Sequence, residues 1–462
     1  MTHTLASTRN VQLASEVLKQ RFGERFLTGD SIREQHAHTL TYLRNQPPDA
    51  VVYAENSSDV ALIVEICAEH NCPVIPFGTG SSLEGQLNAP EGGVSIDMSQ
   101  MNEVVEIHPE DLTVTVQPGI TRKALNSYLR DTGLFFPIDP GADASIGGMA
   151  STRASGTNAV RYGTMKDNVL GVRAVMADGR EIKTASRARK TAAGYDLTRL
   201  LVGSEGTLGV ITEVTLKLHG LPESVAGGIC NFPDISSACQ AAIQTIQYGI
   251  PIARIELLDP VQVAACNAYS KLNLAEKPTV FVEFHGSDAS TAEQSAMFGE
   301  IVSDCGGSDF QWTSDEEKRS KLWQARHDAY WAARGLRPSA EAIVTDACVP
   351  ISQLAACVEQ TCQDIKEHNL LAPIVGHVGD GNFHTSVLVD MNSESELLEA
   401  KQFAERLSHR AISMGGTCTG EHGIGQGKKA YLREELGDTV DFMATIKAAM
   451  DPGNIMNPGK IF

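Results

Sequence analysis

The stretch VIPFGTGSSLEG, residues 74–85, decides the fold expected for the N-terminal half of the chain. It predicts a strand that runs into a glycine-rich turn. Gly78 and Gly80 can adopt positive φ there, so that successive backbone N–H groups converge on an anion. Hydroxyl donors come from Thr79, Ser81 and Ser82. The turn can therefore hold a pyrophosphate.

Two familiar phosphate motifs do not fit this chain. The dinucleotide fingerprint fails because Leu83 stands where the third glycine belongs, and no acidic residue follows at the required distance. A P-loop also fails, since Gly427-Lys428 lacks both the earlier glycine and the following Ser or Thr. Taken alone, residues 74–85 also fit a plain loop.

Two more loops of the same kind favour a ligand. They are PGADASIGGMASTRASGTN, residues 140–158, and LLVGSEGTLGVIT, residues 200–212. Small residues let a backbone approach a bound molecule closely. Three such loops in one region indicate an extended ligand.

Composition excludes several classes of protein. The net charge of −19 disfavours nucleic acid and anionic lipid as partners. The chain has no run of about 20 apolar residues, and its first 17 residues lack the pattern of a signal peptide. Ten cysteines occur without a CxxC spacing, which is typical of a reducing compartment. We expect a cytoplasmic protein, with peripheral attachment at an inner membrane face left open.

The 462 residues suggest two or three domains. Residues 1–50 are expected to form a helical segment that overlaps a domain over 45–220. Within that domain, VMADGREI predicts a hairpin with Asp178-Gly179 as a two-residue turn. After Leu221-Pro222, strands alternate with helices on a longer scale, which predicts a second α+β domain over 221–445. The turn-rich tail, residues 446–462, is expected to pack back on the first domain.

The three loops together resemble the FAD-binding domain of the vanillyl-alcohol oxidase type, over about residues 45–220. The resemblance implies an α+β fold: a two-part FAD-binding domain and an α+β substrate or cap domain with an antiparallel sheet. It also implies FAD, which we expect to be non-covalent because the first loop has no His. The implied FAD contacts are Pro76, Gly78, Thr79, Gly80, Ser81, Ser82, Pro140, Gly141, Asp143, Ser145, Gly148, Ser151, Ser155, Gly156, Glu205, Gly206, Gly209 and Ile211.

The second half carries a pair of histidines in IVGHVGDGNFHTSV, residues 374–387. A two-residue turn at Asp380-Gly381 makes His377 and His384 direct cross-strand partners on one face of a hairpin. Two such imidazoles form a natural metal site, although a purely structural hairpin fits the pattern too.

Glu421 and His422 follow in GGTCTGEHGIGQGKK, residues 415–429. A carboxylate with two imidazoles is typical of an open catalytic site for Zn²⁺, Mn²⁺ or Fe²⁺. Adjacent residues do not easily bind one ion together, so His422 is left to act as a base. A metal that lowers the pKa of an alcohol, beside a base, suits oxidation of a 2-hydroxy acid.

GHVGDGNFH, GTCTGEHGIG and MDPGNIMNPGKIF resemble the C-terminal domain of FAD-linked D-2-hydroxy-acid dehydrogenases. The resemblance implies that His377, His384 and Glu421 bind a divalent metal and that His422 is the catalytic base. Hydride would pass to the flavin and the proton to His422. Asn457 in the closing motif is expected to reach the flavin.

For the substrate carboxylate we expect Arg326, with Tyr330 four residues on and so on the same helical face. Arg334 and Arg337 are weaker candidates, and a plain surface arginine fits as well. ARHDAYWAARGLRP and ARIELLD resemble the D-lactate dehydrogenase (cytochrome) branch. The D-2-hydroxyglutarate branch tends to carry Lys and Asn where this chain has Val344 and Ser386.

Alternative functions are a glycolate dehydrogenase FAD subunit, a D-2-hydroxyglutarate dehydrogenase, a non-redox flavoenzyme making ether-lipid precursors, a non-enzymatic flavin or metal protein, and a non-haem iron oxygenase. Glycolate differs from lactate by one methyl, which is worth only about 1–3 kcal/mol of discrimination. No haem or iron–sulfur motif occurs, so electrons are expected to leave to an external quinone, cytochrome or flavoprotein. A homodimer is left open.

Overall fold

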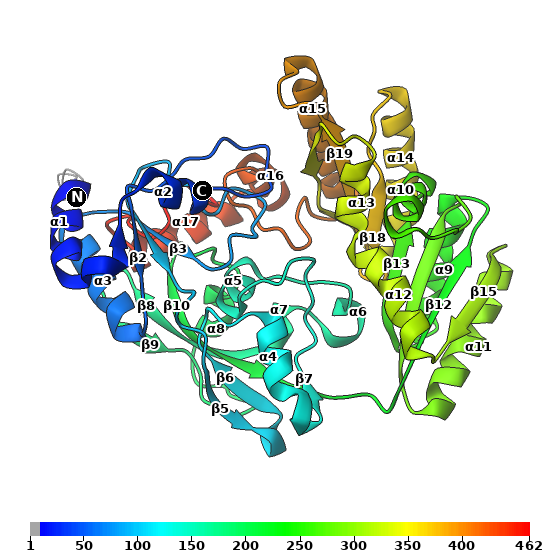
Figure 1. The fold of residues 1–462 in the computed structure, drawn as a ribbon, viewed down its shortest axis with the longest axis horizontal. Helices are drawn as coiled ribbons and strands as arrows, with labels where there is room; N and C mark the ends of the chain where they lie inside the picture. The colour runs from blue at the N-terminus through cyan, green and yellow to red at the C-terminus, as the bar shows by residue number, and fades with distance from the viewer. Residues whose placement is uncertain (1–9) are drawn as a thin grey trace. The chain divides into compact units, whose positions relative to one another are not determined.

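The computed structural model describes residues 10–462, and they form two compact units (Figure 1). Unit 1 holds the chain up to Ala154, together with Thr164–Gly220 and Glu421–Phe462. Unit 2 holds Ser155–Gly163 and Leu221–Gly420. The signal-peptide prediction falls largely on residues 1–9, which lie outside the described residues. Among the described residues, no helix is long and apolar enough to cross a membrane.

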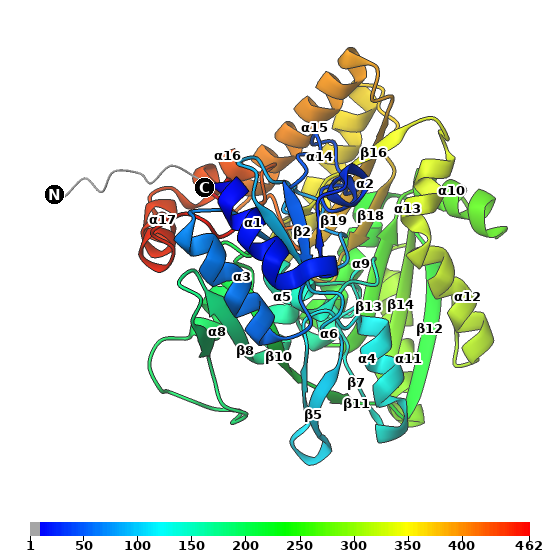
Figure 2. The ribbon, with the colours of Figure 1, turned by 60° about the vertical axis from the view of Figure 1, so that its left-hand side comes forward.

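Unit 1 begins with a four-stranded sheet in the order β1-β2-β4-β3. Strands β2, β4 and β3 are parallel, whereas β1 is antiparallel to β2. Helices α1 and α3 contact one another beside this sheet (Figure 2). The elements are α1 (Val11–Phe22), β1 (Phe26–Leu27), α2 (Asp30–Gln35), β2 (Ala50–Tyr53), α3 (Ser57–Glu69), β3 (Val74–Phe77) and β4 (Val94–Asp97).

The other part of unit 1 is a five-stranded antiparallel sheet in the order β5-β6-β10-β8-β9. Residues of α4 and α5 share one apolar core with this sheet, and residues of α3 share another. Its elements are β5 (Val104–His108), β6 (Thr113–Val116), α4 (Arg122–Leu129), β7 (Leu134–Phe135), α5 (Ile146–Thr152), α7 (Met165–Asn168), β8 (Val169–Met176), β9 (Glu181–Lys183), α8 (Leu197–Leu201), β10 (Gly209–Lys217) and β11 (His219–Gly220). The two-part architecture expected from the sequence is confirmed.

The hairpin predicted around Asp178-Gly179 joins β8 and β9, but its turn differs from the prediction. Val175 pairs with Glu181, and the Met176 N–H bonds the Arg180 carbonyl, so three residues form the loop. Gly179 lies there at φ +80°, which is typical of three-residue hairpin loops. The prediction of a two-residue turn is therefore wrong.

The C-terminal segment of unit 1 contains α16 (Lys429–Leu436), α17 (Thr439–Met450) and the tail. The tail extends the sheet edge at β3, where Val74 forms a parallel bridge with Met456. Residues 421–445 were expected in the second domain, whereas their contacts place them in unit 1. The difference arises because the loop after Glu421 is held by side chains of unit 1, described below.

Unit 2 is an antiparallel sheet in the order β15-β12-β14-β13-β18-β19-β16, with β17 paired to β19. Its strands and helices alternate as the sequence predicts. They are α6 (Ala159–Tyr162), β12 (Ser224–Asn231), α9 (Ile235–Gln247), β13 (Ile252–Leu258), α10 (Pro260–Ser270), β14 (Thr279–Gly286), α11 (Asp288–Asp304), β15 (Ser308–Thr313), α12 (Glu316–His327), α13 (Ala329–Gly335), β16 (Glu341–Val344), β17 (Ala347–Cys348), α14 (Leu354–Glu367), β18 (Ile374–His377), β19 (Asn382–Val389) and α15 (Glu394–Ser413).

Helices cover both faces of this sheet. Side chains of α10, α12 and α13 form one core with Leu258 and Phe281. On the other face, Phe298 of α11 packs edge-on against Phe284 of β14, with ring centroids 5.9 Å apart. Alternate residues of β13 and β14 therefore face the two opposite helix layers. Glu256 of β13 lies on the same face as Leu258, and its side chain contacts Arg326 of α12.

Replacing Phe298 with Ala should lower the free energy of unfolding of unit 2 by about 3–5 kcal/mol, because the ring is fully buried and leaves a cavity. The check is the denaturant midpoint of the transition that reports unit 2. Tyr248→Ala is the control, since that side chain is 69% exposed and should change stability by less than about 0.5 kcal/mol. Equal effects of the two variants would contradict the core assignment.

Candidate functional site

The first glycine-rich loop and the helix α5 approach each other closely within unit 1. A Cβ atom at Gly78 would lie 2.2 Å from the Ser145 Oγ atom, so a larger residue at position 78 would displace that side chain. Ser145 is the N-cap residue that precedes α5, and its backbone N–H donates to the Thr79 hydroxyl at 3.4 Å. Two of the three predicted loops are thus brought side by side by the fold of one unit.

Two hydroxyls in this cradle suit a polar ligand. The Oγ atoms of Ser82 and Ser145 are buried, and within residues 10–462 neither has a hydrogen-bond partner. A buried hydroxyl without a partner is costly, and phosphate or flavin oxygens would satisfy it. The residues present therefore fit the FAD that the sequence analysis expects.

The remaining predicted FAD contacts are divided between the two units. Unit 1 holds all of those from Pro76 to Ser151 and from Glu205 to Ile211, with Asn457. Ser155 and Gly156 belong to unit 2, in the segment that contains α6. Their role as FAD contacts stays a prediction.

The side chains of Glu205 and Asn457 have protein partners. Glu205 accepts the backbone N–H groups of Ile424 and Gly425 at 2.7 and 2.8 Å. Burial raises the pKa of Glu205 to about 7, against the effect of these two N–H donors. Asn457 donates its amide to the carbonyls of Gln86 and Glu205 at 3.1 and 2.7 Å. Both side chains connect segments of unit 1.

In unit 2, the histidine hairpin has a different register from the predicted one. His377 pairs with Asn382, and His384 pairs with Val375, so the direct pairing of the two histidines is wrong. The loop is two residues longer than predicted, and a shift by two preserves the face on which a side chain lies. The imidazoles are diagonal neighbours on one face, with ring centroids 5.4 Å apart.

Each histidine of the pair is oriented through its Nδ1 atom. His377 Nδ1 lies 2.7 Å from Glu256 Oε1, and His384 Nδ1 lies 2.9 Å from the Thr345 carbonyl oxygen. Because both partners are acceptors, Nδ1 is the donor nitrogen of each ring and Nε2 is the nitrogen that can act as a metal ligand. Histidines that bind metals show this arrangement, with the second nitrogen donating to a carboxylate or carbonyl. The donor set fits a divalent cation.

Glu256 is itself buried and doubly bound. Its other oxygen accepts from Arg326 Nε and Nη2 at 2.9 and 2.5 Å. Desolvation raises the pKa of this carboxyl, but His377 and Arg326 outweigh it and hold the pKa below its usual range. The result is a hydrogen-bonded chain from Arg326 through Glu256 to His377.

The predicted substrate residues lie on α12 and α13 of unit 2. Arg326 is buried and pairs with Glu256, so its charge is largely compensated. Tyr330 is half-buried, and burial raises the pKa of its phenol. Their contact with a substrate stays a prediction.

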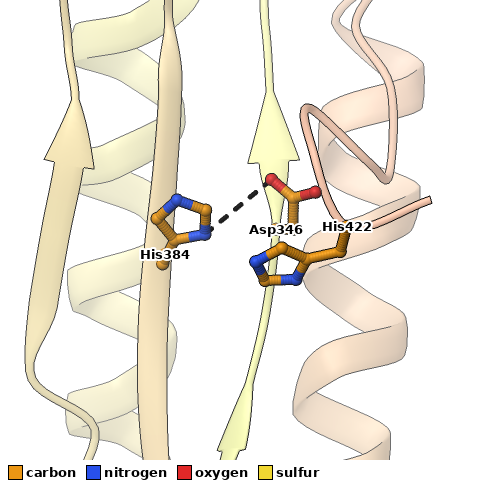
Figure 3. A group of neighbouring side chains, drawn as sticks. All are labelled: Asp346, His384 and His422. Atoms are coloured by element: carbon orange, nitrogen blue, oxygen red, sulfur yellow. Dashed lines mark ion pairs between the residues drawn. The ribbon is translucent and has the colours of Figure 1, made fainter. Parts of the chain in front are cut away.

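Asp346 supports His384 from the loop between β16 and β17. Its Oδ1 atom lies 3.8 Å from His384 Nδ1 (Figure 3) and accepts from Asn382 Nδ2 at 2.8 Å. Its Oδ2 atom accepts from the Thr419 hydroxyl at 3.1 Å. A Cβ atom at Gly420 would meet Asn382 Nδ2 at 2.5 Å, so unit 2 ends beside the histidine pair.

Glu421 follows Gly420 through one peptide bond, and His422 comes next. Consecutive Cα atoms are about 3.8 Å apart, so the Cα atom of Glu421 lies that far from the Cα atom of Gly420, which packs on Asn382. His422, also labelled in Figure 3, has its carbonyl bound by Gln86 Nε2 at 2.9 Å in unit 1. Its Nδ1 atom lies 3.8 Å from Glu84 Oε1.

Sequence reasoning missed Glu256, Asp346 and Gln86. Glu256 stands in the quoted motif ARIELLD, and an acid inside an apolar strand is a signal for a buried charge with a partner. Asp346, in IVTDACV, carries a similar signal. Nothing local marks Gln86, because its partner is 336 residues away.

Two family models match the chain: an FAD binding domain over residues 48–185 and the C-terminal domain of FAD linked oxidases over 221–461. A probable mitochondrial D-lactate dehydrogenase of Danio rerio is 54% identical, over 94% of this chain and 88% of that protein. A mitochondrial D-lactate dehydrogenase [cytochrome] of Arabidopsis thaliana is 48% identical, over 90% and 73%. The solved 4-ethylphenol oxidase of Gulosibacter chungangensis shares the fold, with a TM-score of 0.79 at 17% identity over 99% of this chain and 98% of that one.

Proposed function

Because the chain belongs to the family of FAD-linked oxidases, we propose that it oxidises D-lactate, or a similar small D-2-hydroxy acid, to the 2-oxo acid. The observation that carries the proposal is the pair of histidines, His377 and His384, whose rings are each oriented by a hydrogen bond at Nδ1. Glu421 follows directly after Gly420, which packs on Asn382 beside this pair. The names of the two relatives support D-lactate as the substrate.

The proposed metal ligands are His377, His384 and Glu421. Glu256 and the Thr345 carbonyl direct both Nε2 lone pairs, which supports a Zn²⁺, Mn²⁺ or Fe²⁺ site. A divalent ion bound there would lower the pKa of the substrate hydroxyl.

His422 is the proposed base, taking the hydroxyl proton at an imidazole nitrogen. FAD, when bound, would supply the acceptor for the hydride of C2, so that oxidation removes one proton and one hydride from the alcohol. Glu84, 3.8 Å from His422 Nδ1, would stabilise the imidazolium that results. Electrons would then pass to an external quinone, cytochrome or flavoprotein.

The substrate is proposed to be a small monocarboxylate. Val344 and Ser386 are cross-strand partners, and Ser386 lies on the same face of β19 as His384. Neither side chain can neutralise a second carboxylate, which argues against D-2-hydroxyglutarate. Arg326 and Tyr330 are the proposed carboxylate contacts, although the ion pair with Glu256 already compensates part of the charge of Arg326.

Anaerobic mixing with D-lactate, L-lactate, glycolate and D-2-hydroxyglutarate should bleach the flavin fastest with D-lactate. If none of these acids bleaches the flavin, the proposed function is refuted.

The FAD is proposed to be non-covalent, and the compartment reducing. The first loop offers Ser81 and Ser82 where a covalent link would need a nucleophilic side chain such as His. None of the ten cysteines forms a disulfide. A cytoplasmic location is our proposal, whereas the names of both relatives include "mitochondrial".

Ser145→Ala should weaken FAD binding about tenfold, the loss of one hydrogen bond of about 1.4 kcal/mol. Fluorescence titration of the apoprotein with FAD measures this, and reversible titration itself requires a non-covalent cofactor. Ser99→Ala is the control, because Ser99 is exposed. An unchanged Kd would remove Ser145 from the FAD site.

Glu256→Gln should weaken metal binding about 10- to 100-fold, because the amide no longer fixes the His377 ring as a carboxylate does. Competition with a chromogenic chelator for Mn²⁺ or Zn²⁺ gives the affinity. Glu341→Gln is the matched control: that acid pairs with Arg334 and is mostly exposed. Equal affinities for both variants would show that Glu256 has no role at the metal.

His422→Asn should slow the bleaching of the flavin by D-lactate about 10²- to 10⁴-fold, since the hydroxyl proton loses its acceptor. Stopped-flow absorbance under anaerobic conditions measures the rate. The control His409→Asn changes an exposed imidazole of α15 and should leave the rate unaltered. Bleaching of the His422 variant at the wild-type rate would favour a non-enzymatic flavin protein.

A further inference from the structure

The segment after His422 is rich in glycine, although it adjoins the proposed base, which needs a fixed position. Glycine occupies positions 423, 425 and 427, and residues 421–428 form no helix or strand. Glycine-rich backbone loses much conformational entropy on ordering. The shape of this loop must therefore come from contacts with the rest of unit 1.

Those contacts come from Glu205 and from Glu84 and Gln86, at the end of the first glycine-rich loop and just after it. Glu205 binds the N–H groups of Ile424 and Gly425 with one oxygen each, at 2.7 and 2.8 Å. Gln86 binds the His422 carbonyl at 2.9 Å, and the Glu84 carbonyl accepts the Gln426 N–H at 2.7 Å. The loop is therefore held at four backbone positions, those of residues 422, 424, 425 and 426.

The fit between Glu205 and the loop is close. A Cβ atom at Gly423 would lie 2.7 Å from Glu205 Oε1, and Gly423 has φ +83°. Glu205 itself lies at φ +53°, an uncommon conformation for a residue other than glycine. Its backbone is fixed on both sides: its N–H bonds the Ser151 carbonyl at 2.9 Å, and its carbonyl accepts from Asn457.

We propose that Glu205 is a positioning residue for the base, holding the loop of His422 in register with the FAD-binding loops rather than contacting the substrate. This rests on the proposed function, in which His422 accepts the hydroxyl proton. A carboxylate is needed because it offers one acceptor oxygen to each of two N–H groups. A glutamine at 205 would turn an NH₂ group toward one of them.

The test compares Glu205→Gln holoenzyme with wild type at pH 8. Backbone hydrogen exchange, read by mass spectrometry on peptides covering 421–428, should rise in the variant because the Ile424 and Gly425 amides lose protection. With D-lactate and a dye acceptor, kcat should fall about 100-fold, the scale expected for misplacement of a reacting group by about 1 Å. KM should change less than about threefold, since the substrate contacts stay intact.

Glu213→Gln is the matched control, because that acid lies on β10 of the same unit and its side chain pairs with Arg173 of the neighbouring strand β8. If Glu205→Gln fails to retain FAD, Gly423→Ala tests the same contact from the loop side and should raise exchange and lower kcat likewise. Wild-type exchange over 421–428, or wild-type kcat with unchanged KM, overturns the proposal. The exchange measurement needs no substrate, so it remains informative if D-lactate proves not to be oxidised.

Discussion

The orientation of His377, on which the proposed metal site depends, is fixed by the carboxylate of Glu256, a buried residue in the sheet of unit 2. Glu256 is fully buried and lies between the Arg326 guanidinium and the His377 imidazole. A buried charge of this kind is tolerated only with good partners, and removal of one partner is strongly unfavourable. The same interactions that satisfy Glu256 therefore fix the tautomer and the orientation of His377.

In unit 1, the buried carboxylate of Glu205 likewise fixes the position of a neighbouring segment. Glu205 binds two backbone amides in a glycine-rich loop, whereas Glu256 binds a side chain on a regular strand. In each case a carboxylate accepts more than one donor and so joins segments that are distant in sequence. Burial raises the pKa of Glu205 to about 7, whereas the neighbouring charges keep the pKa of Glu256 low. The local charge balance accounts for this difference.

The chain passes between the two units at Gly420, which is packed on Asn382, and the next two residues are the proposed ligand and base. The proposed ligand and base are thus consecutive residues of unit 1, directly after the last residue of unit 2, and the carbonyl of His422 is bound within unit 1 by Gln86. This explains why a boundary drawn from local strand, helix and turn patterns, near residue 445, differs from the boundary drawn from contacts.

The sequence by itself determined the fold class, the three glycine-rich loops and the identity of the histidine pair. These depend on local patterns: strand and turn signals, and a two-residue periodicity that places His377 and His384 on one face in either register. It could not determine the register, since a turn signal such as Asp380-Gly381 fits hairpin loops of more than one length. Only the tertiary structure decided which partners the buried acids meet, because His377 lies 121 residues from Glu256 and Ile424 lies 219 residues from Glu205. Hydrogen bonds over such separations leave no local pattern, because packing of the whole unit brings their atoms together.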